Sequence, residues 1–182
     1  MDVSSITSRE TEYREFFRDV HPDATRFALR RADAAIAEEA VGDAMLVAWR
    51  RFDEAPHDPG DRRAWLFGIV RNTLLNARRS QFRQHSLAVK LAGSDDRLGV
   101  DHAHAVGTRA DVRASWDRLS AAQQEVLTLV ILDDLTAEQA ARVLGVAAAT
   151  VRARAMRARR ALQRMLPDHR PIPSRFEEKE AQ

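Results

Sequence analysis

Six arginines fall between Arg152 and Arg164, and no acidic residue interrupts them. A guanidinium group forms paired hydrogen bonds with phosphate oxygens and with the major-groove edge of guanine. The residue types in this segment therefore favour binding to a polyanion, with nucleic acid as the first candidate. The chain around it must then form an element that presents these side chains on one face.

A helical projection of residues 150–166, at about 100° per residue, separates apolar from cationic side chains. One side gathers an apolar stripe: Val151, Ala155, Ala158, Leu162, Met165 and Leu166. The opposite side gathers the cationic face: Arg152, Ala153, Met156, Arg157, Arg160 and Arg164. Arg154 and Arg159 fall on the two flanks. The pattern predicts a helix with a narrow buried edge and a cationic outer face.

The preceding segment, LTAEQAARVLGV (residues 135–146), predicts a short helix followed by a turn. Thr136 with Gln139 three residues later is the signature of a capping box. Gly145 then gives a typical helix stop. A short capped helix, a glycine turn and a longer basic helix form the helix-turn-helix pattern, whose second helix enters the major groove of DNA.

A basic helix also occurs as a solvated face of a helical bundle, or as a docking site for an acidic protein. The capped helix and the glycine turn before it favour DNA over that alternative. Met156 supports DNA as well, because an apolar side chain among arginines can contact a thymine methyl group.

Motifs for catalysis or metal binding are scarce in this sequence. The absence of Cys excludes disulfides, Cys-ligated zinc and thiol catalysis. The sequence has no glycine-rich phosphate loop, H-E-x-x-H motif or nucleophile elbow. Asp101, His102 and His104 are the best candidate metal cluster, but they have no obvious fourth ligand and no general base. We therefore expect a protein that is not an enzyme and that has no metal and no cofactor.

Charge and hydropathy restrict the location of the protein. The 182 residues carry a net charge of +2, so the distribution of charge matters more than its sum. No apolar run approaches the ~20 residues of a membrane helix. The N-terminus also lacks the basic and apolar regions of a signal peptide. We expect a cytoplasmic protein that does not insert into a membrane.

Helical periodicity over most of the chain predicts an all-α fold. Apolar residues recur at helical spacing from Tyr13 to Ala28, with Pro22 expected to interrupt the helix. Residues 37–52 and 65–77 predict two more helices, and residues 55–61 predict a loop from their Pro and Gly content.

The periodicity also predicts how the chain is divided. It fades over residues 85–111, which we expect to be a flexible linker, and returns near Trp116. The tail after Pro167 is expected to be disordered. We therefore expect two small helical domains joined by a linker: residues 8–84, linker 85–111, residues 112–166 and tail 167–182.

Three blocks of the chain resemble bacterial RNA polymerase sigma factors of the extracytoplasmic-function (ECF) type, which belong to the sigma-70 family. AEEAVGDAMLVAWRRFDE resembles the region 2 helix that docks on the polymerase clamp, and RAWLFGIVRNTLLNARR resembles the helix that opens the −10 element. LSAAQQEVLTLVILDDLTAEQAARVLGVAAATVRARAMRARRAL resembles the whole of region 4. The blocks occur in the family's order, and the resemblance covers about residues 10–166.

The resemblance implies a sigma factor, which has no catalytic centre. Such a protein binds core RNA polymerase, directs it to a promoter and helps to separate the DNA strands. Residues 8–84 would be region 2, with the helix-turn-helix of region 4 within residues 112–166. The resemblance also implies an anti-sigma factor as an antagonist.

The resemblance assigns residues to three contact surfaces. Readers of the duplex −35 element would be Thr150, Arg152, Ala153, Arg154, Met156, Arg157 and Arg160. Contacts to the −10 element would come from Pro56, His57, Arg62, Arg63, Ile69, Arg71, Asn72, Arg78 and Arg79, with Ile69 and Asn72 at a pocket for an unstacked base. Contacts to polymerase would come from Glu38, Glu39, Gly42, Asp43, Leu46, Val47 and Arg50.

Three positions depart from the family pattern. Pro56 stands where the −10 loop often has an aromatic residue. Gly42 costs the clamp-binding helix about 1 kcal/mol relative to Ala. Ala147 replaces the usual Ser cap of the recognition helix, at a loss of about 1 kcal/mol.

Two alternatives to the sigma-factor interpretation stay open, and so does the role of the linker acids. The chain could be a helix-turn-helix regulator that binds duplex DNA without polymerase, or an inactive relative that acts as a decoy. The linker acids Asp95, Asp96 and Asp101 could mimic nucleic acid inside polymerase, or could serve to solvate a flexible tether.

Overall fold

The computed structural model describes residues 3–89 and 108–166, with side chains described for residues 8–83 and 112–166. All regular secondary structure in these ranges is helical, which confirms the all-α prediction. The chain divides into two compact units, Met1–Asp101 and His102–Gln182, and each is described by itself. None of the described helices has both the length and the hydrophobicity that a membrane span requires.

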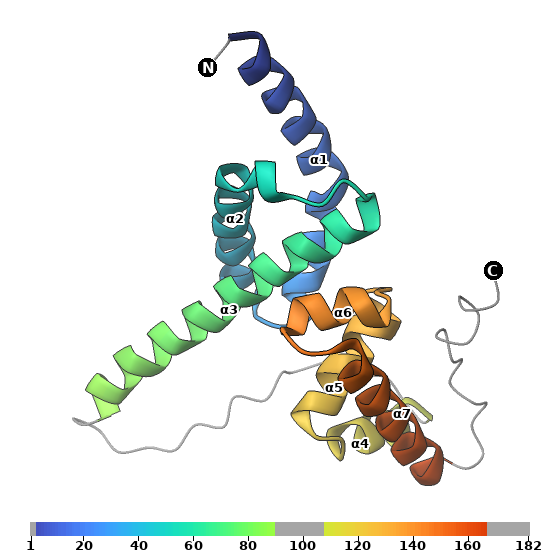
Figure 1. Ribbon diagram of the computed structural model, residues 1–182. Helices are drawn as coiled ribbons and strands as arrows, with labels where there is room; N and C mark the ends of the chain where they lie inside the picture. The colour runs from blue at the N-terminus through green and yellow to red at the C-terminus, as the bar shows by residue number, and fades with distance from the viewer. Residues whose placement is uncertain (1–2, 90–107, 167–182) are drawn as a thin grey trace, which may run out of the picture. The chain divides into compact units, whose positions relative to one another are not determined.

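The N-terminal unit packs three helices, α1 (Val3–Leu29), α2 (Ala34–Arg50) and α3 (Pro59–Val89), as Figure 1 shows. A short 3-10 helix, η1 (Phe52–Glu54), follows α2. The larger buried side chains come from all three helices: Phe16, Val20, Phe27, Val41, Met45, Leu66, Phe67, Val70 and Leu74. Phe27 of α1 stacks on Phe67 of α3, with the ring centroids 4.5 Å apart.

Tyr13 of α1 contacts the C-terminal part of α2 through a hydrogen bond and ring packing. Its hydroxyl group donates a 2.6 Å hydrogen bond to the carbonyl oxygen of Met45, and its ring lies edge-on to Trp49 and Phe52 at 5.0 and 5.1 Å. Partial burial raises the pKa of the Tyr13 phenol above its usual value, because the phenolate would lose solvation there.

Pro22 does not interrupt the first helix, so that prediction is wrong. Helix α1 is continuous from Val3 to Leu29, with Pro22 inside it. An internal proline costs about 3 kcal/mol, because it removes one backbone hydrogen bond and crowds the preceding turn. Here Pro22 is exposed, while Val20 and Ala24 beside it are buried in the core of the unit. Burial of the apolar face on both sides of Pro22 offsets this local cost.

The loop expected over residues 55–61 is shorter than predicted, because α3 begins at Pro59. The Asp58 carboxylate accepts a 2.8 Å hydrogen bond from the backbone N–H of Asp61, and the Asp58 carbonyl accepts one from Arg62, also 2.8 Å. Asp58 is thus the N-cap, and Pro59 occupies the first helical position, where its missing N–H costs nothing. The Pro and Gly content suggested a loop, but the Asp-Pro pair marks a helix start.

The C-terminal unit contains α4 (Thr108–Asp117), α5 (Ala121–Leu127), a π-helical turn η2 (Thr128–Leu132), α6 (Ala137–Leu144) and α7 (Ala148–Met165). One core cluster joins Leu119, Leu127, Ala158 and Leu162, with Trp116, Ala161 and Met165 packed against it. Helix α7 therefore lies against the helices that precede it in this unit.

The π-helical turn changes which side chains of this segment are buried. The backbone N–H of Asp133 donates to the carbonyl of Thr128, five residues back, at 3.0 Å. In this wider turn Ile131 is 39% and Leu132 57% exposed. The extra residue in a π turn shifts the register of the buried face.

Helical structure reaches into both ends of the expected linker. Helix α3 continues to Val89 and α4 begins at Thr108, so residues 85–89 and 108–111, at the two ends of the range expected to be a linker, are helical. The linker acids and the cluster Asp101, His102 and His104 lie outside the described residues, as does the tail after Leu166.

Candidate nucleic-acid interface

The structure confirms the helix-turn-helix between α6 and α7. The backbone N–H of Gln139 donates to the Thr136 hydroxyl at 3.2 Å, and the Thr136 N–H donates to the Gln139 side-chain oxygen at 3.0 Å. These two hydrogen bonds form the predicted capping box of α6. At the other end, Gly145 has φ 66° and ψ 38°, which is the left-handed conformation that ends a helix.

The recognition helix α7 starts without a side-chain cap, as the sequence predicted. Ala147 is the N-cap residue, and its carbonyl accepts hydrogen bonds from the N–H groups of Thr150 and Val151 at 2.9 and 3.3 Å. Thr150 lies in the first turn of α7, so it cannot replace the missing cap.

The two predicted faces of α7 are present. Val151, Ala155 and Ala158 have no exposed surface, and Leu162 is 5% exposed. The outer face contains the exposed side chains Arg152, Met156, Arg157, Arg160 and Arg164, with Thr150, Ala153 and Arg154 half-buried beside them. One flank differs from the prediction: Arg159 is only 8% exposed, because it lies on the side of α7 that packs against the unit.

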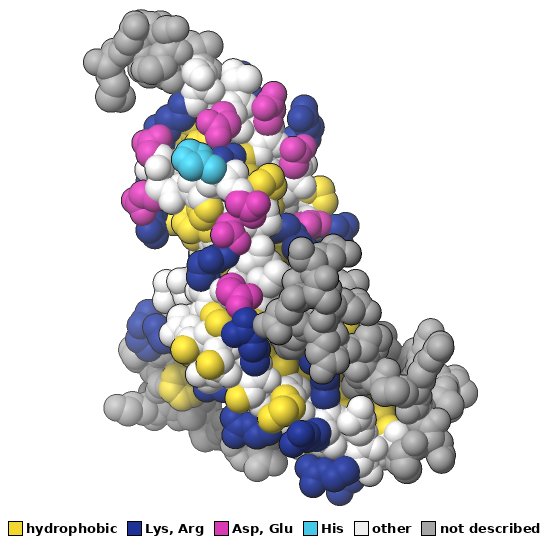
Figure 2. Space-filling model, turned by 45° about the vertical axis from the view of Figure 1, so that its right-hand side comes forward, with side chains coloured by type: hydrophobic (Ala, Val, Ile, Leu, Met, Phe, Trp, Pro, Cys, Tyr) yellow, Lys and Arg dark blue, Asp and Glu magenta, His cyan; other side chains and the backbone are white. Residues whose placement is uncertain are grey.

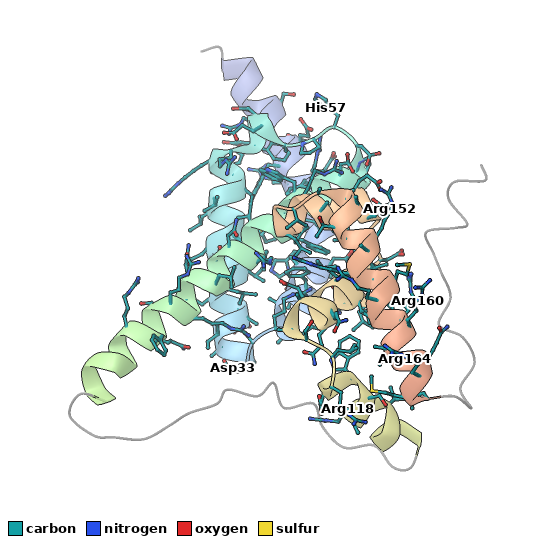
Figure 3. All side chains as sticks on the ribbon, turned by 60° about the horizontal axis from the view of Figure 1, so that its bottom comes forward. Asp33, His57, Arg118, Arg152, Arg160 and Arg164 are labelled. Carbon is teal, nitrogen blue, oxygen red and sulfur yellow. The ribbon has the colours of Figure 1, made fainter. Side chains whose placement is uncertain are left out.

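The outer face of α7 is cationic along its length. Arg152, Arg160 and Arg164 follow one another along the helix (Figure 3). On the face drawn in Figure 2, dark-blue basic side chains gather over the C-terminal unit, with yellow hydrophobic side chains between them. Met156 belongs to the outer face of α7 and is 46% exposed. Such a surface can bind phosphates through guanidinium groups and a thymine methyl group through Met156.

One residue of this surface was missed by the sequence analysis. The Glu138 carboxylate in the first turn of α6 forms an ion pair with Arg152 of α7. Both side chains are about half exposed, at 52% and 45%, so the pair adds little to stability. It does hold one guanidinium of the outer face next to a negative charge. Only the packing of α6 against α7 brings these residues together, so the linear sequence gave no signal.

The predicted polymerase-contact residues lie on the outer side of α2. Six of them are exposed and Val47 is half-buried; the exposed residues are Glu38, Glu39, Gly42, Asp43, Leu46 and Arg50. The opposite side of α2 is buried through Ala37, Ala40, Val41, Ala44 and Ala48. The outer side therefore combines three acids with Leu46, whose side chain is 59% exposed.

The residues predicted to contact the −10 element differ in exposure and in their contacts within the protein. His57 (Figure 3), Asn72, Arg78 and Arg79 are exposed, Pro56 and Arg71 are half-buried, and Ile69 is buried. Arg78 also donates a hydrogen bond to the Arg31 carbonyl. Arg62 donates a 2.6 Å hydrogen bond to the Pro56 carbonyl and pairs with Glu12 at 3.1 Å. Arg63 pairs with Asp23 at 2.6 Å. Both guanidinium groups thus stabilise the N-terminal unit and the loop before α3.

Comparison with known proteins places both units in one family. Residues 16–84 match Sigma-70 region 2, and residues 110–162 match Sigma-70, region 4. Over 169 residues the chain is 30% identical to the ECF RNA polymerase sigma factor SigL of Mycobacterium tuberculosis, covering 91% of this chain and 96% of SigL. Over 154 residues it is 32% identical to the ECF RNA polymerase sigma factor SigM of the same organism, covering 84% of this chain and 76% of SigM.

A solved structure shows the same relationship. The chain is similar to the sigma factor RpoE in its complex with the anti-sigma factor NepR from Bartonella quintana, with a TM-score of 0.61 and 27% identity. The similarity covers 87% of this chain and 99% of that chain. Matches to both sigma-70 regions, together with a relative aligned over almost its whole length, show that the chain belongs to the ECF RNA polymerase sigma factors of the sigma-70 family.

Proposed function

We propose that this sigma factor binds core RNA polymerase and directs it to promoters whose duplex −35 element is read by the outer face of α7. One observation carries the proposal: Val151 is fully buried, whereas Arg152 and Arg157 are exposed. The apolar edge thus fixes α7 on its unit and leaves the guanidinium groups accessible to a DNA groove. In this proposal Arg152, Met156 and Arg157 contact base edges, while phosphates are held by Thr150 and Arg154.

Helix α3 would capture the −10 element. Asn72 is exposed on this helix and offers both a donor and an acceptor to the edge of an unpaired base. Arg71, Arg78 and Arg79 would follow the phosphate backbone. We assign Arg62 to holding the loop in place, because its guanidinium group already bonds the Pro56 carbonyl and Glu12.

The outer side of α2 would dock on core polymerase in the cytoplasm. Its acids would orient the sigma factor on the polymerase, and the exposed Leu46 provides an apolar contact that can be buried on binding. An anti-sigma factor that covers this surface would prevent the docking. The similarity to RpoE, solved in complex with NepR, supports such an antagonist for this chain.

Reconstitution with purified core polymerase tests the proposal. The chain should co-purify with the polymerase, and run-off transcription on fragmented genomic DNA should give transcripts that start at defined sites. Arg157→Ala should reduce this selectivity, whereas Arg118→Ala, which removes an exposed arginine outside α7, should keep it. Duplex DNA binding without a polymerase complex would instead indicate a stand-alone regulator. A stable complex without defined start sites would indicate a decoy.

A further inference from the structure

Phe82 is the most exposed large apolar side chain that the structure describes, at 75%. It lies on α3, whose last buried side chain among the described residues is Leu74. The helix continues to Val89, so about 22 Å of it extends beyond Leu74. In Figure 1 this green end of α3 extends away from α1 and α2 of the same unit. Phe82 therefore lies on a helical arm outside the core.

The arm continues a face of α3 that is already proposed to bind DNA. Asn72, Leu75, Arg79 and Phe82 recur at spacings of three and four residues, so they share one side of the helix. The buried side chains Leu66, Val70 and Leu74 lie on the opposite side. Phe82 is thus on the same outward face as Asn72, about 15 Å further along the helix.

The charge around Phe82 indicates the kind of partner that it fits. Arg78, Arg79 and Arg83 are exposed beside it, and no acidic residue occurs in the sequence between Asp61 and Asp95. An apolar protein surface placed on Phe82 would have to strip water from these guanidinium groups, which is unfavourable. A nucleic-acid strand instead offers phosphates to the arginines and a flat base to the ring.

Phe17 of α1 provides a contrast within the same unit. Its side chain is 40% exposed and its ring lies 4.9 Å from the ring of His21. Glu15, Arg18 and Asp19 surround it in the sequence, so its neighbourhood has mixed charge. Exposure of an aromatic ring alone does not point to nucleic acid; the acid-free arginine surroundings of Phe82 do.

We propose that Phe82 is a stacking platform for an unpaired base of the promoter strand that the N-terminal unit captures. Arg79 and Arg83 hold the adjacent phosphates. The inference rests on the proposed promoter-opening function and adds a second base contact to that of Asn72. A duplex strand rises about 3.4 Å per nucleotide and an unpaired strand can extend further, so the roughly 15 Å between the two residues spans at most about four or five nucleotides.

The test uses the holoenzyme and a promoter recovered by the run-off assay, prepared with a mismatched bubble over the −10 element. Phe82→Ala should weaken binding to the bubble by roughly 5- to 150-fold, because stacking on an aromatic ring contributes on that scale. Phe82→Trp should retain binding to the bubble. Phe82→Leu should weaken it as Phe82→Ala does, since leucine keeps the apolar volume without a flat ring. Phe17→Ala is the matched control and should bind as the wild type does.

Abasic nucleotides then locate the stacked base. Scanned along the strand, one abasic position should weaken wild-type binding yet have no further effect on Phe82→Ala. This position should lie within about four or five nucleotides of the position that is sensitive to Asn72→Ala. The inference is overturned if Phe82→Leu binds as tightly as the wild type, or if every abasic position acts additively with Phe82→Ala. A wild-type holoenzyme that yields no promoter contradicts the proposed function itself, whereas a functional holoenzyme insensitive to Phe82→Ala contradicts this inference alone.

Discussion

Two glycines with equal space around them should respond oppositely to the same substitution. A Cβ atom at Gly42 or at Gly145 would meet no described atom within 4 Å, so steric crowding is absent at both. Gly42 lies inside α2, where alanine is the better helix former, whereas Gly145 has φ 66° at the end of α6. Backbone conformation is therefore the only difference that should matter.

The magnitudes follow from that difference. Gly42→Ala should raise the free energy of unfolding of the N-terminal unit by about 1 kcal/mol, the interval between glycine and alanine inside a helix. At Gly145 an L side chain in the left-handed region costs roughly 1–2 kcal/mol, offset by about 0.4–1 kcal/mol from the reduced entropy of the unfolded chain. Gly145→Ala should therefore lower the free energy of unfolding of the C-terminal unit by about 1 kcal/mol.

Urea denaturation followed by peptide-level hydrogen exchange measures the two changes separately, because the exchange assigns each change to its unit. Gly145→Asn is the control, since asparagine tolerates the left-handed conformation and should lose less than alanine does. Shifts of the same sign for Gly42→Ala and Gly145→Ala would refute the reasoning. So would a Gly145→Asn variant less stable than Gly145→Ala.

Three further predictions concern the recognition helix. Arg157→Ala should weaken binding to the −35 element by about 1–3 kcal/mol and relax one base position, as measured by competition between promoter variants, with Arg118→Ala unchanged. Ala147→Ser should supply the missing cap of α7 and raise the free energy of unfolding of the C-terminal unit by about 1 kcal/mol. An unchanged unfolding temperature in calorimetry would contradict the cap assignment. Glu138→Gln should alter the free energy of unfolding by less than about 1 kcal/mol, because its ion pair with Arg152 is exposed. It should nevertheless steepen the dependence of the holoenzyme–DNA binding constant on salt concentration. An unchanged slope would show that Glu138 lies away from the DNA.

Local signals in the sequence predicted the helix-turn-helix correctly. The Thr136 and Gln139 capping box, the left-handed Gly145 and the uncapped Ala147 all involve contacts between residues a few positions apart. The exposed arginines and the buried edge of α7 were predictable for the same reason, since helical periodicity places side chains on a face without knowledge of the partner helix.

Contacts between segments far apart in the chain could not be predicted from the sequence. Arg63 meets Asp23 forty residues away, and Arg152 meets Glu138 across the turn between α6 and α7. These partners determine which arginines are engaged within the protein, and periodicity carries no information about them.

The sequence by itself therefore determined the helical class, the α6–turn–α7 motif and the cationic outer face of α7. The tertiary structure decided that α1 continues through Pro22 and that the π turn exposes Ile131. At Pro22 a local preference of a few kcal/mol yields because packing of the neighbouring apolar residues contributes more. At Ile131 the extra residue of the π turn shifts the register of the buried face.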